Sequence, residues 1–298
     1  MMDVKEALQF LNNVLWDEAR QGYRECVGRD YVWFIDNFVA WIVMRKYDPA
    51  KAEVLERNFK SYDNYPYGFS RWCILYGDTE NFTQSPKVLP DYMRYADLVA
   101  LQYLYHWYKG ESERAKLMYA YLMNMLVKPA NFPGDAVFIE DLATRVGYKT
   151  FTDETYKWIL AMGKPRPEGH TLYKLALLAM CSMRHNRFDV AKQCLETIGK
   201  FQVGNPQSEL YRNGDPNLFP ENPLIEKGGI KTEWWNPDYG PKPPWLETKA
   251  NVETTCLCIL AQTEYSEGTS IWPSVIPWLL IGTALGFGAG YAFGRKKS

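Results

Sequence analysis

Residues 95–127 read YADLVALQYLYHWYKGESERAKLMYAYLMNMLV, and this stretch decides the fold. Its apolar and aromatic side chains recur with the spacing of a helix that buries one face. Gly110 interrupts the pattern, and a charged amphipathic segment follows it. A glycine between two such segments is typical of a helix end and a turn. The stretch therefore predicts a helical hairpin.

The same design recurs along the chain. Residues 171–201 read TLYKLALLAMCSMRHNRFDVAKQCLETIGKF, with a predicted turn near Asn186. Residues 31–47 and 251–265 are similar to the first helix of such a hairpin, and residues 154–160 are a fifth candidate. Strand-like alternation is rare by comparison. We therefore expect an all-α fold of helical hairpins.

Composition bounds the class of protein. The chain has 298 residues, of which 47% are hydrophobic and 23% charged, as in an ordinary globular protein. We expect one helical-hairpin domain over residues 1–265, in which residues 204–249 form a proline-rich loop region. A net charge of -1 gives no reason to expect a nucleic-acid partner. The six cysteines lack the paired spacing of a metal site, so no metal or cofactor is expected. Their disulfide pairing is left open.

The end of the chain predicts a membrane anchor. Residues 271–294 contain no charged side chain and are long enough to cross a bilayer. Trp272 and Trp278 stand at the start of this run, where indoles favour the headgroup region. The basic tail, residues 295–298, follows with Arg295, Lys296 and Lys297, which favours a cytoplasmic C-terminus. We predict a single-pass membrane protein whose domain faces outward.

One alternative to this topology, and one question about association, stay open. Residues 1–19 have charges and no apolar core of a signal peptide, so a cytoplasmic domain is the competing interpretation. Within the predicted membrane helix, four glycines recur every fourth residue: Gly282, Gly286, Gly290 and Gly294. Such a face lets a second transmembrane backbone approach, which favours a homodimer in the lipid. Glycine is, however, common in membrane helices in general.

Short motifs carry a family resemblance. Residues 228–235 read GGIKTEWW and residues 250–255 read ANVETT, and the predicted helices open in a recurring way. Together these features resemble the α/α-toroid superfamily of six-hairpin glycosidases, polysaccharide lyases and terpenoid-cyclase-like domains. The resemblance covers roughly residues 8–262. It implies hairpins closed into a ring, with the ends of the inner helices around a cleft.

In such a ring the openings of the inner helices would converge. The resemblance then implies three candidate catalytic carboxylates, Asp36, Asp97 and Glu253. It also implies substrate-binding side chains at Trp33, Asn37, Tyr95, Tyr156, Tyr173, Trp234 and Trp235. Carboxylates beside aromatic rings suit sugars, because rings stack on indole while two acids serve as proton donor and base. The competing interpretation is that the acids only favour helix N-termini and that Tyr173 belongs to the core.

The function is left between three classes. No catalytic signature is complete, so we favour a membrane-anchored surface protein that binds glycan or protein ligands through this cleft. A surface-anchored glycoside hydrolase or polysaccharide lyase is the first alternative, favoured if two carboxylates share one cleft. A tetratricopeptide-like scaffold on the cytoplasmic face is the second. The spacing of 61 from Asp36 to Asp97 and 59 from Asp97 to Tyr156 exceeds the roughly 34 residues of that repeat, which favours the ring.

Overall fold

The computed structural model describes residues 1–83, 96–126, 172–204, 225–231 and 249–271. The predicted helix over residues 154–160 and most of the proline-rich region lie outside these ranges. So does the predicted anchor after Ile271, with its glycines, tryptophans and basic tail. Among the described residues, no helix is both long and apolar enough to cross a membrane. The anchor and its orientation therefore stay predictions.

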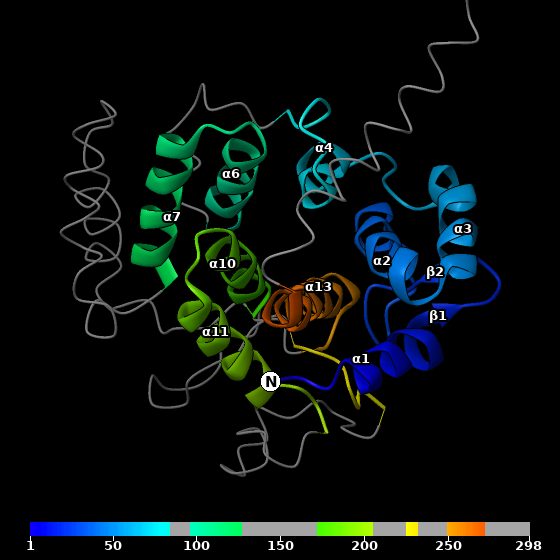
Figure 1. Cartoon of the computed structure of the whole chain (residues 1–298). Helices are drawn as coiled ribbons and strands as arrows, with labels where there is room; N and C mark the ends of the chain where they lie inside the picture. The colour runs from blue at the N-terminus through cyan, green and yellow to red at the C-terminus, as the bar shows by residue number, and fades with distance from the viewer. Residues whose placement is uncertain (84–95, 127–171, 205–224, 232–248, 272–298) are drawn as a thin grey trace, which may run out of the picture.

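The described part is mostly helical, which confirms the expected all-α class. Four helices lie toward the inside: α2 (Phe34–Tyr47), α6 (Ala96–Tyr108), α10 (Leu172–Arg184) and α13 (Val252–Ile271). Four lie outside them: α1 (Val4–Phe10), α3 (Pro49–Asn58), α7 (Ser112–Leu126) and α11 (Phe188–Lys200). Figure 1 shows this arrangement of an inner and an outer set.

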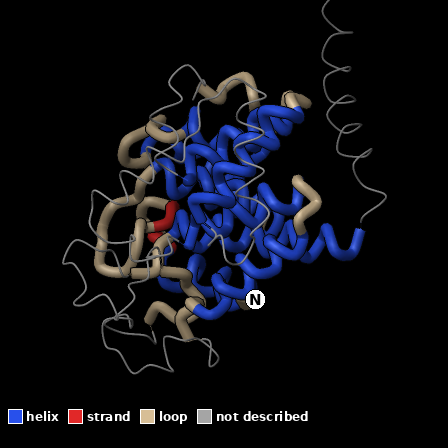
Figure 2. Tube along the Cα trace, turned by 90° about the vertical axis from the view of Figure 1, so that its left-hand side faces the viewer, coloured by secondary structure: helices blue, strands red, loops and turns tan. Residues whose placement is uncertain are grey.

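Short elements connect the helices. They are the π-helix η1 (Leu11–Leu15), the 3-10 helices η2 (Phe59–Ser61) and η3 (Cys73–Tyr76), and the one-turn helix α4 (Phe69–Trp72). Strands β1 (Trp16–Asp17) and β2 (Gly22–Tyr23) pair antiparallel, with Trp16 opposite Tyr23. Figure 2 shows that these strands and several of the loops gather at one side of the helices.

Two of the expected hairpins are confirmed. Helix α6 packs against α7, and α10 packs against α11. Gly110 and Asn186, the residues expected at the turns, both have a positive φ, of 72° and 59°. Glycine adopts this left-handed conformation at little cost, and asparagine tolerates it better than most residues. The chain therefore reverses where the sequence pattern breaks.

The helix contacts run in a circuit. Helix α13 packs against both α2 and α10, and α10 packs against α6. Helix α6 contacts η3, and α4, which directly precedes η3, contacts α2. The sequence of contacts thus returns to α2, as the positions of these elements in Figure 1 also show.

The inner helices run in the same direction: the C-terminal ends of α2 and α10 contact the second half of α13, and the end of α10 also contacts the end of α6. At the end of α2, the Tyr47 hydroxyl lies 2.6 Å from the Thr263 hydroxyl of α13. At the end of α10, Arg184 donates to Glu264 of α13 over 2.5 Å and lies 3.5 Å from the hydroxyl of Tyr108, the last residue of α6. The N-terminal ends of these helices must therefore share the opposite side.

Aromatic side chains from α2, η2, α4 and η3 pack together. The ring of Phe38 packs against five others: Phe34, Trp41, Phe59, Phe69 and Tyr76. Edge-to-face and offset contacts of this kind stabilise a core beyond the area they bury. Part of the aromatic content, which is 15% of the chain, is therefore structural. All six cysteines are buried and free, so no disulfide joins them.

Asn37 ties the first turn of α2 to strand β2. Its side chain is fully buried and accepts a hydrogen bond of 2.6 Å from the amide of Tyr23. Its amide group donates to the carbonyl oxygens of Tyr23 and Trp33, over 3.0 and 2.8 Å. Removing the side chain would leave buried backbone groups without partners, which is costly.

We predict that Asn37→Ala lowers the free energy of unfolding by about 3 kcal/mol, the cost of two or three buried polar groups left unpaired. Urea denaturation of the full chain measures it. Asn58→Ala on α3 is the matched control, since Asn58 is only partly buried and donates only to Val54. An equal loss in both variants would contradict the structural role of Asn37.

Candidate functional site

Carboxylates meet at the N-terminal end of the inner helices. Asp36, Asp97 and Glu253 each lie in the first turn of their helix, α2, α6 and α13. Their charges interact: Glu253 acts on Asp36, and Asp97 acts on Glu253. Helix N-termini favour negative charge, but three acids brought together also repel one another. The structure therefore brings the three candidate catalytic residues into one cluster.

A fourth carboxylate, Glu25, joins this cluster through the backbone. The amide of Val252, which begins α13, donates to the carbonyl oxygen of Glu25 over 3.1 Å. The next residues, Cys26 and Asn251, form an isolated antiparallel bridge. The Asn251 side chain accepts from the Thr254 amide over 2.8 Å, as an N-cap does. Glu25 is thereby held beside the start of α13.

Arg71 supplies the positive charge of the cluster. It belongs to α4 and forms an ion pair with Asp97. Gly68, just before α4, has φ +85°, and a Cβ at this position would lie 2.4 Å from the Ile35 side chain. Only glycine allows so close an approach in this conformation. Gly68 thus permits α4 to pack on the first turn of α2, which brings Arg71 to the acids.

The environment changes the pKa values of two acids. Burial raises the pKa of Glu253 to about 7; Arg71 opposes this shift, whereas Asp97 and Glu25 add to it. Glu253 is nevertheless partly exposed, so solvent reaches the residue. Burial, and then the charges of Glu253 and Glu25, raise the pKa of Asp36 well above its ordinary value. A carboxyl group with a pKa near 7 can give or take a proton at neutral pH.

Asp36 has an unused polar atom. The residue is 5% exposed, and its Oδ2 atom has no hydrogen-bond partner among the residues that the structure describes. An unpaired buried oxygen costs free energy and is uncommon in folded proteins. A neutral carboxyl group lowers this cost compared with a charged one. Asp36 therefore keeps unused hydrogen-bonding capacity inside the cluster.

Two aromatic rings lie beside Glu25. Trp33, the residue before α2, donates from its indole nitrogen to Glu25 Oε2 over 3.4 Å. Its ring packs against Tyr31 with centroids 5.2 Å apart, and Tyr31 is 49% exposed. These two partly exposed rings, tilted by 32° to one another, offer apolar surface to a sugar. Tyr31 was not among the residues singled out from the sequence.

The other candidate binding residues divide into three groups. Asn37 is fully buried and uses its polar atoms within the fold, as described above. Tyr173 lies in the first turn of α10, is partly buried, and has the ammonium group of Lys174 5.6 Å from its ring centre. The remaining four lie outside the described residues: Tyr95, Tyr156, Trp234 and Trp235.

Sequence reasoning missed Glu25 and Arg71. Neither belongs to a predicted helix opening, and the contacts that place them involve segments more than twenty residues away in the chain. No periodicity signals such contacts. In the described part of the chain, no group of three or more His, Cys, Asp or Glu residues is arranged to hold a metal ion.

Comparison with known proteins does not assign this chain to a family. No protein-family model matches the chain, and no curated protein or solved structure matches it. Conclusions about function therefore depend on the site itself.

The raised pKa of Glu253 should make the stability of the protein depend on pH. In the unfolded chain its pKa returns to the ordinary value near 4.5, so between about pH 4.5 and 7 only the folded state holds this proton. Stability from this group is thus present at low pH and is lost as the pH rises to 7. Glutamine does not titrate, so Glu253→Gln removes this loss. Compared with the wild type, the free energy of unfolding of the variant should be more favourable at pH 8 than at pH 4 by roughly 1–3 kcal/mol.

The measurement is the free energy of unfolding of both proteins from pH 4 to 8. Glu53→Gln, an exposed change on α3, is the matched control and should leave the pH dependence as it is. Identical pH profiles for the wild type and Glu253→Gln would show that Glu253 is an ordinary surface carboxylate.

Proposed function

We propose that this chain is a carbohydrate-active enzyme of the α/α-toroid type, which cleaves glycosidic bonds by acid–base chemistry at the carboxylate cluster. One observation carries the proposal: Asp36, Asp97 and Glu253 interact at one end of the inner helices, and Glu253 has a pKa of about 7. Most enzymes that hydrolyse glycosidic bonds use two carboxyl groups, one protonated and one charged.

The roles follow from the environment of each acid. Glu253 is partly exposed and protonated near neutral pH, so it is the proton donor. Asp97 forms the ion pair with Arg71 and is the carboxylate that accepts a proton. In hydrolysis, Glu253 protonates the glycosidic oxygen as the bond to the anomeric carbon breaks. Water adds to that carbon, and Asp97 takes the proton that water releases.

The aromatic pair supports a sugar as the substrate. Tyr31 and Trp33 lie next to Glu25, whose charge acts on both Glu253 and Asp36. A ring of a glycan stacked on this pair would lie beside the acids. The circuit of inner helices and the shared direction of their N-terminal ends also fit a toroid.

Binding without cleavage is the second candidate. The ion pair with Arg71 already occupies Asp97, and this favours recognition of a ligand over proton transfer. Under this alternative, the Tyr31–Trp33 pair and the partly exposed Glu253 would hold a glycan that remains intact.

We predict that the full chain, purified in detergent, releases new reducing ends or unsaturated sugars from one member of a panel of neutral and uronate-containing polysaccharides. Glu253→Gln and Asp97→Asn should each lower the rate at least about 100-fold, the usual contribution of an acid or a base. Asp189→Asn, an exposed change on α11, is the control and should keep full activity.

The assay separates the two candidates. A polysaccharide that binds but is never cut would rule out the enzyme and leave the binding protein. Cleavage that persists in folded Glu253→Gln protein would show that the acids have been given the wrong roles.

A further inference from the structure

A groove lies at the other end of the molecule from the carboxylate cluster. It has a volume of about 690 Å³ and runs between α1, η1, the end of α2 and the second half of α13. Glu253 and Glu267 are separated by fourteen residues of one helix, or roughly 21 Å at 1.5 Å per residue. The groove and the cluster are therefore separate sites.

The groove is lined mainly by three kinds of side chain. Val4 and Leu8 supply apolar surface, and Lys5 and Lys46 supply positive charge. Hydroxyl and amide groups complete the lining: Tyr47, Thr263, Ser266, Gln9, Asn12 and Asn13. One carboxylate, Glu267, also lines it and pairs with Lys46. Cationic and hydroxyl donors next to apolar side chains suit a phosphate group attached to a hydrocarbon chain.

The position of the groove along the chain favours the same ligand. Glu267 stands four residues before Ile271, which begins the uncharged run of residues 271–294. Four residues correspond to roughly 6 Å along a helix, about the thickness of one headgroup layer of a bilayer. If the run is the anchor predicted from the sequence, the groove lies at the level of the lipid headgroups.

Partly exposed aromatic rings, two of them with a guanidinium group nearby, also lie at this end. Tyr47 is 38% exposed, Trp107 39% and Tyr76 37%, although each is a large aromatic residue. The guanidinium group of Arg45 lies 4.9 Å from the ring centre of Trp41, and that of Arg184 lies 5.2 Å from the ring centre of Trp107. Trp and Tyr are the residues enriched at both membrane interfaces.

We propose that the groove between α1 and α13 is a binding site for the headgroup of an anionic phospholipid, with Lys5 and Lys46 contacting the phosphate and Val4 and Leu8 contacting the first part of an acyl chain. The site holds the end of the domain against the bilayer and leaves the carboxylate cluster facing away from it. The inference depends on the predicted anchor and not on the proposed enzyme activity.

Native mass spectrometry of the full chain in a mild non-ionic detergent tests it. Phosphatidylglycerol is added, and in separate experiments diacylglycerol, which lacks the phosphate, and inorganic phosphate. We expect saturable binding of phosphatidylglycerol at one site, at least tenfold tighter than that of diacylglycerol. An excess of inorganic phosphate should not displace the lipid.

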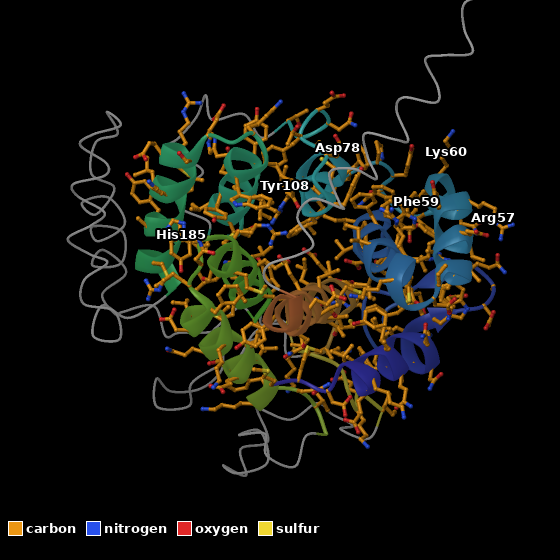
Figure 3. All side chains as sticks on the ribbon, viewed as in Figure 1. Arg57, Phe59, Lys60, Asp78, Tyr108 and His185 are labelled. Atoms are coloured by element: carbon orange, nitrogen blue, oxygen red, sulfur yellow. The ribbon has the colours of Figure 1, made fainter. Side chains whose placement is uncertain are left out.

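The variants locate the site. Lys5→Glu with Lys46→Glu should weaken phosphatidylglycerol binding at least tenfold, and Lys5→Glu alone should weaken it severalfold without breaking the Lys46–Glu267 pair. Lys60→Glu is the control for Lys5→Glu alone, because both change the net charge by the same amount. Lys60 is exposed at the outer edge of the molecule near the end of α3, whereas Tyr108 lies nearer the middle (Figure 3).

Three results would overturn the proposal: equal binding of diacylglycerol, full displacement by inorganic phosphate, or undiminished lipid binding in Lys5→Glu. Because Glu253→Gln leaves the groove intact, that variant should bind phosphatidylglycerol like the wild type. A failure of the lipid site is thereby distinguished from a failure of the proposed activity.

Discussion

The packing of α13 between α2 and α10 is the constraint on which the rest of the structure depends. Helix α13 is fixed at its start and again in its second half. Its first residues bond to the segment around Glu25, and its later residues bond to Tyr47 of α2 and Arg184 of α10. These contacts require α2, α10 and α13 to point the same way. The position of the carboxylates at one end, and of the groove at the other, follows from that shared direction.

Gathering acids at one end opposes folding, and the structure limits the cost in three ways. Arg71 pairs with Asp97, the N-terminal ends of three helices favour negative charge, and burial raises the pKa values of Asp36 and Glu253, which favours their neutral forms. Apolar side chains in these positions would give a more stable fold, because unpaired buried acids cost free energy. Stability alone therefore does not explain the cluster. Strain of this kind is typical of functional sites.

The sequence predicts the helices and turns well, because they depend on local patterns. The apolar periodicity of residues 95–127 and the turn residues Gly110 and Asn186 are enough to place α6, α7, α10 and α11. It also singles out Asp36, Asp97 and Glu253, since each opens an inner helix. It cannot find Arg71 or Glu25, because the contacts that bring them to the cluster depend on Gly68 and on the bridge between Cys26 and Asn251. The sequence also does not show that the Asn37 side chain bonds to the backbone of Tyr23, because Tyr23 lies in a strand too short to have a periodic pattern.

The most direct test of the account is a double-mutant cycle between Asp97 and Glu253, which belong to different helices and are separated by more than 150 positions in the chain. The free energy of unfolding is measured at pH 8 for the wild type, Asp97→Asn, Glu253→Gln and the double variant. If the first turns of α6 and α13 meet, the two changes should differ from additivity by at least about 0.5 kcal/mol, as expected for neighbouring charges. Additivity within about 0.3 kcal/mol, the behaviour of distant sites, would contradict the shared cluster.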